Sequence, residues 1–312
     1  MERLKILFIT KDHSQWITKN YIYFIEKLSK YTELKVWYDA ADIRYILKEL
    51  DFQPDFILLN DFRPHMLPKI TRLSSINIPL GIIIEDLHRE IEEGRKFINE
   101  NNIKNVFSIS RDKFYKSYPN YKHDVYWLPH WVNTGVFKDY GLEKDIDYLL
   151  MGAIVQEHYP LRKLIFDKMQ NETGFIYNKH PGYKNIKDNN ALVGKKYARE
   201  INRAKIFFTD GGIYNYPVKK YYEVLACKTL LLAPTFKELE DLGFIPGVNF
   251  VAINGSDFFE KAKFYLEHKE EREKITENGY NMVRSKHSTE MRVIQFVKTV
   301  QDILIKNHIY KR

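Results

Sequence analysis

The sequence predicts an α/β protein built from two doubly wound parallel sheets. Short apolar runs alternate along the chain with segments in which apolar residues recur at the helical period, which is the pattern of β-α-β units. The length of 312 residues suits two hydrophobic cores of roughly 150 residues each better than one. A hydrophobic content of 44% and an aromatic content of 15% are enough to fill such cores.

The first half of the chain contains six short runs with the composition of buried strands. They are rich in β-branched and aromatic residues and are bounded by polar or turn residues. Between the first two runs, apolar residues from Tyr21 to Leu28 recur at helical spacing, which predicts an amphipathic helix. The predicted strands are Ile6 to Ile9, Leu34 to Trp37, Phe56 to Leu59, Ile82 to Ile84, Val106 to Ile109 and Val125 to Leu128.

The second half repeats this arrangement with five further runs. Apolar residues from Val218 to Leu225 again have helical spacing. The predicted strands are Tyr148 to Met151, Phe175 to Tyr177, Ile206 to Phe208, Leu230 to Leu232 and Phe250 to Ile253.

The domain boundary is predicted where this periodicity lapses, between Leu128 and Asp147. We expect Rossmann-like domains at residues 1–135 and 136–287, facing each other across a cleft. Ser288 can cap a last helix with an apolar stripe. We therefore expect residues 288–312 to form a helix that packs back across the junction.

The composition narrows the cellular setting. The single cysteine, Cys227, excludes an internal disulfide and fits a reducing compartment. The first apolar run is too short for a signal sequence, and no run approaches the roughly 20 apolar residues that span a bilayer. These features predict a soluble cytoplasmic protein. The net charge of +8 fits a solvated lysine-rich surface, and alternatively a contact with an anionic membrane surface, nucleic acid or nucleotide.

The most informative stretch runs from residue 205 to residue 234. It contains an apolar run, a loop with Gly211 and Gly212, a predicted helix start at Pro217 and a second apolar run. In a parallel sheet, such a unit places a glycine loop and a helix N-terminus at the carboxyl ends of the strands, where both favour a phosphate group. A nucleotide-type ligand is therefore the first hypothesis.

Three charged residues follow this loop. Lys219 and Lys220 precede Glu223 by four and three positions, so all three can lie near one helix face. A carboxylate there can accept the two hydroxyls of a ribose while a lysine faces the phosphates. The alternative is an exposed Lys–Glu helix pair, which contributes only about 0.3 kcal/mol.

The segment from Pro217 to Leu232, PVKKYYEVLACKTLLL, resembles the donor-site segment of GT-B glycosyltransferases. The likeness is closest to the branch that includes the spore-maturation protein CgeB. Further matches upstream are Leu128-Pro129-His130, Asp145-Ile146-Asp147, Met151-Gly152, Tyr159 to Arg162 and His180-Pro181-Gly182-Tyr183. Further matches downstream are Glu238-Leu239, Leu242 to Phe244, Pro246 to Asn249, Tyr265-Leu266, Arg272, Ile275, Asn278-Gly279 and His287-Ser288.

This resemblance implies a GT-B fold and a glycosyltransferase that uses a nucleotide diphosphate sugar, in particular a UDP-sugar. The C-terminal domain would hold the donor and the N-terminal domain the acceptor, whose identity stays open, and no cofactor or obligatory metal is expected. Glu223 matches the family glutamate that binds the donor ribose. The predicted donor-binding residues are Glu223, Lys220, Lys219, Tyr222, Gly211, Gly212, Asn215, His180 and Arg162.

Two positions depart from the family pattern. Asn215 stands where retaining relatives often carry a second glutamate, and Lys228 replaces the usual glycine after Ala-Cys. The stereochemical outcome therefore stays open. A catalytically silent nucleotide-sugar-binding or structural protein remains an alternative, as do GT-B epimerisation or hydrolysis and an acceptor that is DNA or another polyanion.

An inverting enzyme needs a base within reach of the acceptor hydroxyl. Asp86 and His88 follow one predicted strand of the first domain, Asp12 and His13 follow another, and Asp61 follows a third as a further candidate. Both pairs lie where a doubly wound sheet presents its ligands, and Asp86 with His88 is the preferred pair. The alternative role for such residues is to cap the next helix or bind its backbone.

No metal site is predicted. Asp145 and Asp147 superficially resemble the metal-binding Asp-x-Asp of GT-A glycosyltransferases, but they enter a predicted strand. The sequence contains no Cys/His cluster of zinc type, no P-loop and no Gly-x-Ser-x-Gly motif.

Overall fold

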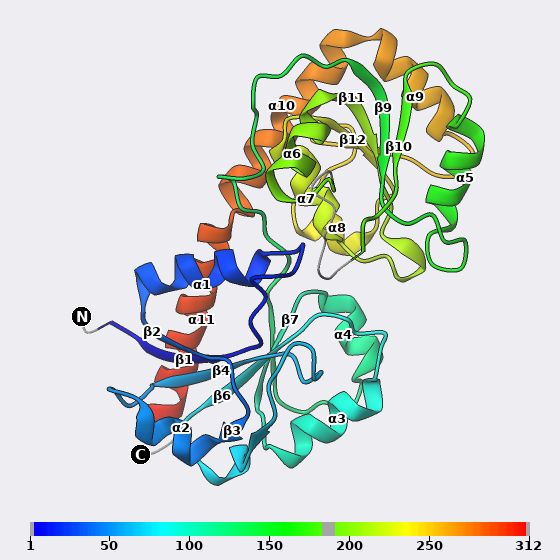
Figure 1. The fold of residues 1–312 in the computed structure, drawn as a ribbon. Helices are drawn as coiled ribbons and strands as arrows, with labels where there is room; N and C mark the ends of the chain where they lie inside the picture. Colours follow the sequence, from blue (N-terminus) through cyan, green and yellow to red (C-terminus); the bar gives the residue numbers. More distant parts are fainter. Residues whose placement is uncertain (1–2, 183–190, 310–312) are drawn as a thin grey trace. The chain divides into compact units, whose positions relative to one another are not determined.

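The structure is a computed structural model that describes residues 3–182 and 191–309. Tyr183, at the end of one family motif, lies outside these residues. Contacts within the chain divide it into two compact units (Figure 1). The first unit comprises Met1–Ser14, Tyr21–Pro129 and Arg292–Arg312, and the second comprises Gln15–Asn20 and His130–Met291.

The first unit is built on a six-stranded sheet whose strands are all parallel and follow the order β2-β1-β4-β6-β7-β8. The chain moves from β1 to β2 on one side and then crosses to β4 on the other side. The sheet therefore has a topological switch point between β1 and β4. The strands are β1 (Lys5–Ile9), β2 (Glu33–Trp37), β4 (Phe56–Asn60), β6 (Leu80–Ile84), β7 (Asn105–Ser108) and β8 (Asp124–Trp127).

Helices cover this sheet on the connections between its strands, as β-α-β geometry requires. The helices of the first unit are α1 (Asn20–Tyr31), α2 (Ile43–Glu49), α3 (Ile91–Glu100), α4 (Arg111–Ser117) and most of α11 (Thr289–Ile309). A short 3-10 helix, η1, spans Leu73–Ser75. Two short strands, β3 (Ala41–Asp42) and β5 (Ile70–Thr71), pair outside the main sheet.

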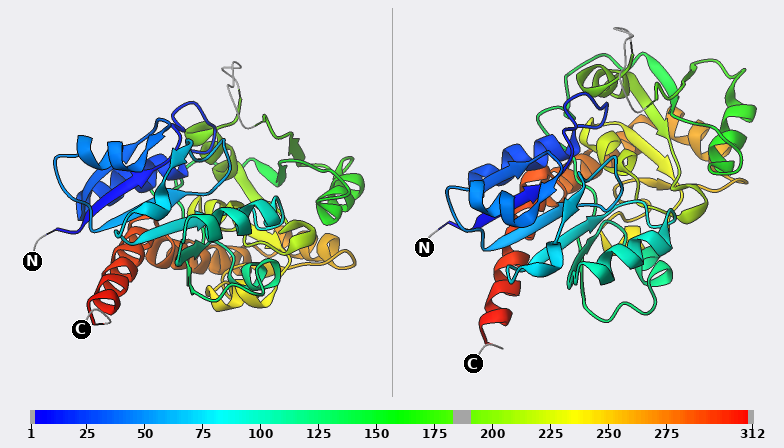
Figure 2. Two further views of the ribbon diagram at one scale, coloured as in Figure 1. Left: turned by 90° about the horizontal axis from the view of Figure 1, so that it is seen from below. Right: turned by 60° about the horizontal axis from the view of Figure 1, so that its bottom comes forward.

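Most of helix α11 is part of the first unit although it follows the second unit in sequence, and Figure 2 shows it from two further sides. Its Phe296 is fully buried. The ring centroid of Phe296 lies 5.6 Å from that of Phe24, 6.4 Å from that of Phe56 and 5.1 Å from that of Phe107. The apolar stripe of the last helix therefore completes the aromatic core on one face of this sheet.

The second unit is built on a five-stranded parallel sheet with the order β10-β9-β11-β12-β13. The strands are β9 (Ile146–Met151), β10 (Phe175–Asn178), β11 (Ala204–Phe208), β12 (Leu230–Ala233) and β13 (Val251–Ala252). The helices are α5 (Pro160–Met169), α6 (Gly194–Arg203), α7 (Lys219–Ala226), α8 (Lys237–Asp241), α9 (Phe258–Glu267) and α10 (Lys269–Lys286), with a 3-10 helix η2 (Gly212–Tyr214). One core cluster joins the strands to α5, α9 and α10.

The predicted fold class, two doubly wound parallel sheets, is confirmed. Each of the eleven predicted strand runs overlaps a strand of the structure, although β13 is shorter than its run. The oxygen of Ser288 accepts a hydrogen bond from the Met291 N–H, as expected for a cap. The predicted helix start at Pro217 is wrong by two residues. Val218 has extended backbone angles, so the helix begins at Lys219.

Candidate functional site

The candidate site lies in the second unit, at the carboxyl ends of β9 and β11. The chain passes from β9 to β10 on one side and then returns to β11 on the other side of β9. Ligands of open α/β sheets bind outside the carboxyl ends of the strands at such a switch point. Gly152 follows β9 here, and Asp210 lies two residues after β11.

Gly152 brings bare backbone close to two cations. Its φ of 123° is a conformation that side chains rarely adopt. A Cβ at this position would lie 3.2 Å from the Lys220 Nζ and 3.4 Å from the Arg162 Nη1. Glycine therefore leaves bare backbone against both cations, where an added side chain would crowd them.

Arg162 is buried and links the two loops at the switch point. Its Nε lies 2.8 Å from Asp210 Oδ1, and its Nη2 donates to the Asp210 carbonyl at 3.0 Å. Its Nη1 donates to the Ala153 carbonyl at 3.3 Å, and its guanidinium stacks 3.9 Å from the centroid of the Tyr159 ring. The arginine fork thus fixes the loop after β9 to the loop after β11 while leaving positive charge beside Gly152.

Lys220, in the first turn of α7, carries a readily titrated charge. Burial and the neighbouring Arg162 lower the pKa of its ammonium group to about 8, although Glu223 and Asp210 oppose that shift. A negative ligand would favour the charged form of this lysine. The side chain is therefore suited to binding a phosphate group.

Glu223 lies one turn after Lys220 on the same helix. Burial raises the pKa of its carboxyl group, while Lys220, Lys219 and the Tyr197 hydroxyl act in the opposite direction. Tyr197 comes from α6, and its hydroxyl is buried. The structure thus brings together the predicted Lys–Glu group and adds a tyrosine that the sequence did not indicate.

His180 follows β10 and faces the same two cations. Burial, Lys220 and Arg162 together lower the pKa of its ring to about 4. Its Nδ1 accepts a hydrogen bond of 3.0 Å from the Gly182 N–H. The ring is therefore neutral near pH 7 and can act as a hydrogen-bond partner without adding charge.

The glycine loop after β11 folds tightly onto its surroundings. A Cβ on Gly211 would lie 2.6 Å from the Tyr216 carbonyl oxygen, and one on Gly212 would lie 2.7 Å from the His158 carbonyl oxygen. Gly212 also has a φ of 63°. Both glycines are required by the path of the chain itself, which accounts for them without a ligand. Asn215 is exposed and ends η2 with a φ of 53°.

Tyr222 occupies the core, so the prediction that it binds a donor needs correction. Its side chain is fully buried, with ring centroids 5.1 Å from Phe244 and 5.2 Å from His287. Successive residues on a helix point about 100° apart, so Tyr222 faces the interior while its neighbours Lys220 and Glu223 share another face.

Lys228 explains how the chain replaces the family glycine. Its φ of 55° is the left-handed conformation that glycine adopts most readily. Its ammonium group lies 3.0 Å from Glu277 and 3.5 Å from Asp139. A residue other than glycine thus adopts the left-handed conformation at this position.

In the first unit, Asp86 and His88 follow β6 in a segment of turns. The carbonyl of Asp86 accepts a hydrogen bond of 2.6 Å from Arg63. Burial lowers the pKa of the His88 ring, and Asp86 opposes this shift. The two residues are therefore close enough to interact, although the segment forms turns and not the extended chain on which the prediction of this pair was based.

Asp12 and His13 differ in their surroundings. Asp12 is exposed, and its two carboxylate oxygens accept hydrogen bonds from the backbone and side chain of Ser14. His13 is buried, with its ring centroid 5.9 Å from that of Tyr21. The Asp12 carboxylate thus stabilises a local turn at Ser14, and does not cap the next helix, which begins at Asn20.

The described part of the chain contains no group of three or more His, Cys, Asp or Glu side chains placed to hold a metal ion. Asp145 is paired with Arg203, and the Asp147 carboxylate lies 2.6 Å from the Lys205 Nζ. Both aspartates of the Asp-x-Asp sequence therefore have basic partners. Cys227 is a buried free thiol, and burial raises its pKa well above the usual value.

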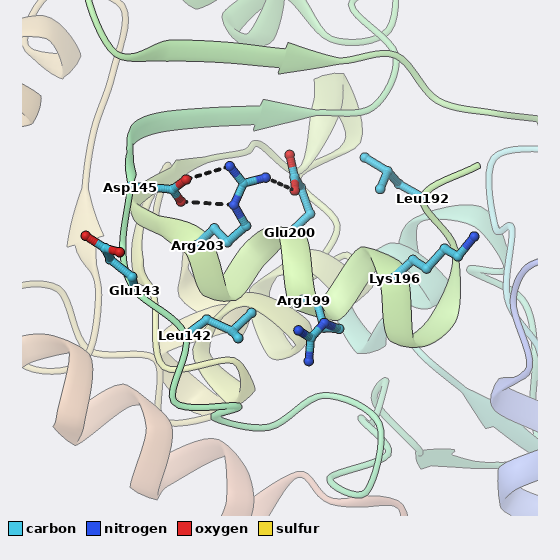
Figure 3. Close-up of a pocket in the computed structure, with 8 residues that line it drawn as sticks. All are labelled: Leu142, Glu143, Asp145, Leu192, Lys196, Arg199, Glu200 and Arg203. Atoms are coloured by element: carbon cyan, nitrogen blue, oxygen red, sulfur yellow. Dashed lines mark hydrogen bonds and ion pairs between the residues drawn. The ribbon is translucent and has the colours of Figure 1, made fainter. Parts of the chain in front are cut away.

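A cavity of about 410 Å³ lies along α6, next to the segment that precedes β9 (Figure 3). Asp145, at its edge, immediately precedes β9. Arg203 pairs with both Asp145 and Glu200 within this cavity, so the two carboxylates share one guanidinium group. Glu200, which lines this cavity, also accepts a hydrogen bond of 3.3 Å from the Asn178 side chain at the carboxyl end of β10, so the cavity extends along α6.

A second cavity of about 510 Å³ lies at the carboxyl ends of β12 and β13. Pro234 and Ile253 contribute to it from the ends of these strands, and Leu161 and Leu164 from α5. Its walls are mainly apolar. Leu161 directly precedes Arg162, so α5 contributes to both this cavity and the cationic group at Gly152.

Three residues of this site were missed by sequence reasoning about binding: Gly152, Asp210 and Tyr197. Gly152 and Asp210 each come shortly after a predicted strand, which is a signal that could have identified them. Tyr197 lies within a helix and has no comparable local signal.

No helix in the described residues is both long and apolar enough to cross a membrane.

Comparison with protein families matches residues 153–298 to a family described as glycosyl transferase-like. The matched region contains Arg162, His180, Lys220 and Glu223. Comparison with the curated proteins finds no match.

Solved structures resemble the fold over nearly the whole chain. Sucrose-phosphate synthase from Thermosynechococcus elongatus has a TM-score of 0.67 at 12% identity, covering 97% of this chain and 100% of that one. HepE of Anabaena in complex with UDP-glucose has a TM-score of 0.62 at 10% identity, covering 96% and 100%. An α-glucosyltransferase in complex with UDP-glucose and DNA has a TM-score of 0.61 at 12% identity, covering 96% and 99%. At these identities the likeness establishes the fold, which is GT-B, as predicted.

Proposed function

We propose that this GT-B protein is a glycosyltransferase that moves a sugar from a UDP-sugar to an acceptor hydroxyl without a resident metal. The observation that carries the proposal is the group at the switch point of the second unit. Lys220 and Arg162 both lie beside the bare backbone of Gly152, and Glu223 follows one turn after Lys220. The two cations are suited to a diphosphate, and the Glu223 carboxylate is suited to a ribose.

Lys220 and Glu223 would bind different parts of the nucleotide. Lys220 would pair with the diphosphate, since binding of a negative group offsets the cost of keeping its buried ammonium group charged. The Glu223 carboxylate would accept hydrogen bonds from ribose hydroxyls, because an ionised carboxylate is an acceptor only. The choice of uridine follows the UDP-glucose complexes of the structural relatives.

In the reaction, the bond between the anomeric carbon and the diphosphate oxygen breaks, and a bond from the acceptor oxygen to that carbon forms. Negative charge develops on the departing diphosphate, where Lys220 and Arg162 would stabilise it. For an inverting reaction, the proton of the acceptor hydroxyl would pass to a base of the first unit, with Asp86 and His88 as the candidates. The CgeB-like branch is proposed on the sequence motifs.

A catalytically silent nucleotide-sugar-binding protein is the second candidate, favoured by Asn215. This exposed residue stands where retaining relatives often carry a glutamate, and its left-handed φ of 53° is readily adopted by asparagine. Such a protein would bind the nucleotide sugar and show no turnover.

The test is calorimetric binding of UDP, GDP and dTDP to the wild type and to Glu223→Gln, each with and without a metal chelator. We expect chelator-resistant binding of UDP that weakens by about 10- to 100-fold in the variant, since a hydrogen bond to a charged group contributes about 1.5–3 kcal/mol. Glu273→Gln, on the exposed side of α10, is the matched control and should bind as the wild type does.

Four results would contradict the proposal in different ways. Equal UDP affinity in Glu223→Gln would remove the ribose assignment, and loss of binding with the chelator would remove metal independence. UDP-sugar binding without release of UDP in the presence of a broad set of acceptors would favour the silent protein. UDP release that needs no acceptor would indicate hydrolysis.

A further inference from the structure

The segment 85–90 follows β6 and carries both candidate bases of the first unit. It belongs to no strand or helix, so its shape depends on contacts from neighbouring elements. The Tyr21 hydroxyl donates to the Glu85 carboxylate at 2.7 Å, and the Ser117 hydroxyl donates to the Leu87 carbonyl at 2.7 Å. These contacts hold the residues on either side of Asp86.

Arg63 supplies the contacts that hold Asp86 and Arg89 themselves. Its Nη2 donates to the Asp86 carbonyl at 2.6 Å and to the Arg89 carbonyl at 3.1 Å. Its Nε lies 3.3 Å from the Glu90 carboxylate. One guanidinium group therefore reaches three residues of a six-residue segment.

Asp61 holds this guanidinium group in place. The Arg63 Nη1 donates to Asp61 Oδ2 at 2.7 Å, and only 3% of the arginine side chain and 1% of the aspartate side chain are exposed. The other oxygen of Asp61 accepts from the backbone N–H groups of Phe62 and Arg63. Asp61 lies directly after β4 with a φ of 63°, a conformation that this set of hydrogen bonds stabilises.

We propose that Arg63 is a positioning residue for the reaction: braced by Asp61, it fixes the segment 85–90 so that Asp86 and His88 keep a defined place at the end of β6. The proposal rests on the proposed function in that it takes this segment as the source of the base. A buried ion pair contributes little to stability on balance, and its best-attested value is to specify one arrangement of the chain.

The chemistry of the side chain explains why an arginine stands here. A guanidinium group has five donors in a fixed plane, so it can bind a carboxylate on one edge and backbone carbonyls on another. A lysine would keep the charge beside Asp61 but would lack the second edge. Arg63→Lys therefore keeps the positive charge and removes the hydrogen bonds to the Asp86 and Arg89 carbonyls.

The first measurement follows the His88 ring by NMR during a pH titration, and needs no substrate. The groups that act on His88 are Asp86, Arg89, Lys113 and Arg63, and burial lowers its pKa. In Arg63→Lys, the freed segment should expose the ring and move its pKa upward, toward the usual value, by about half a unit or more. The His88 signal is assigned by its absence in His88→Gln.

The matched control is Arg72→Lys, which alters another arginine–aspartate pair of the first unit, Arg72 with Asp42. It should leave the His88 titration unchanged. If Arg63→Lys does not fold, Asp61→Asn keeps the charge of Arg63, which itself acts on His88, and removes the carboxylate that braces it, so it should produce the same shift. If folded Arg63→Lys has the same His88 pKa as the wild type, or if Arg72→Lys shifts this pKa by an equal amount, the proposal is overturned.

Turnover provides a second readout. With the acceptor found for the wild type, Arg63→Lys should lower kcat by about 10- to 100-fold, since a small misplacement of a reacting group has an effect of this size. Its affinity for UDP should not change. If the wild type does not bind UDP, the proposed function alone is refuted. If Arg63→Lys shifts the His88 pKa but leaves kcat unchanged, Arg63 positions the segment without an effect on catalysis, and its role in the reaction is refuted.

Discussion

The affinity for UDP-glucose should fall as the pH rises through the range in which Lys220 loses its proton. The pKa of this lysine in the ligand-free protein is about 8, because burial and Arg162 disfavour its charge. A bound diphosphate favours the charged form and should return the pKa toward the usual value of about 10.4. Binding therefore takes up a proton wherever the free lysine is neutral, and higher pH opposes binding.

The magnitude follows from the fraction of charged lysine in the free protein. With a pKa of about 8, this fraction is roughly nine-tenths at pH 7 and roughly one-tenth at pH 9. The affinity should therefore fall about tenfold between these values, which corresponds to about 1.4 kcal/mol. Glu223 and Asp210 face the same lysine, and both favour its charge.

Calorimetry at several pH values tests this dependence, with buffers of different ionisation enthalpy to count the protons taken up. Lys220→Arg is the matched control, since an arginine stays charged throughout this range and should give a flat profile. A wild-type affinity that is constant between pH 7 and pH 9 would refute the reasoning, and so would a fall of equal size in Lys220→Arg.

Two further predictions concern the fold that holds the sites. Phe296→Ala should lower the free energy of unfolding by about 3–5 kcal/mol in urea titrations, because it removes a fully buried ring from the first unit. The control Ile305→Ala, at a side chain that is 56% exposed, should change this free energy by less than about 0.5 kcal/mol. Equal effects of the two substitutions would contradict the assigned core. Gly212→Ala should destabilise the protein by about 1–3 kcal/mol, because its Cβ would lie 2.7 Å from the His158 carbonyl oxygen at a φ of 63°, and wild-type stability in thermal unfolding would contradict the described loop.

The alternation of apolar runs and helical periods was sufficient to predict both sheets. A run such as Phe56 to Asn60 is buried over its whole length, and that pattern is typical of a central parallel strand. The short strands β3 and β5 escaped prediction because two-residue pairings produce no periodicity. The start of α7 was placed two residues early, since the extended conformation of Val218 is not encoded in the apolar spacing.

Local spacing also predicted part of the candidate site. Lys220 and Glu223 are three positions apart on one helix, so the helix alone brings them to one face. The same helix turns Tyr222 into the core, and the sequence did not distinguish this residue from its neighbours because tyrosine occurs in both settings.

The sequence by itself determined which segments become strands and helices, because the hydrophobic period is a local property of the chain. It also determined the pairing of residues within one helix. Only the tertiary structure decided that Arg162 meets Asp210, that Gly152 opens beside Lys220 and that Arg63 holds the segment after β6. These contacts join elements whose neighbours are set by the order of strands in each sheet, and that order follows from how the whole chain buries its apolar surface.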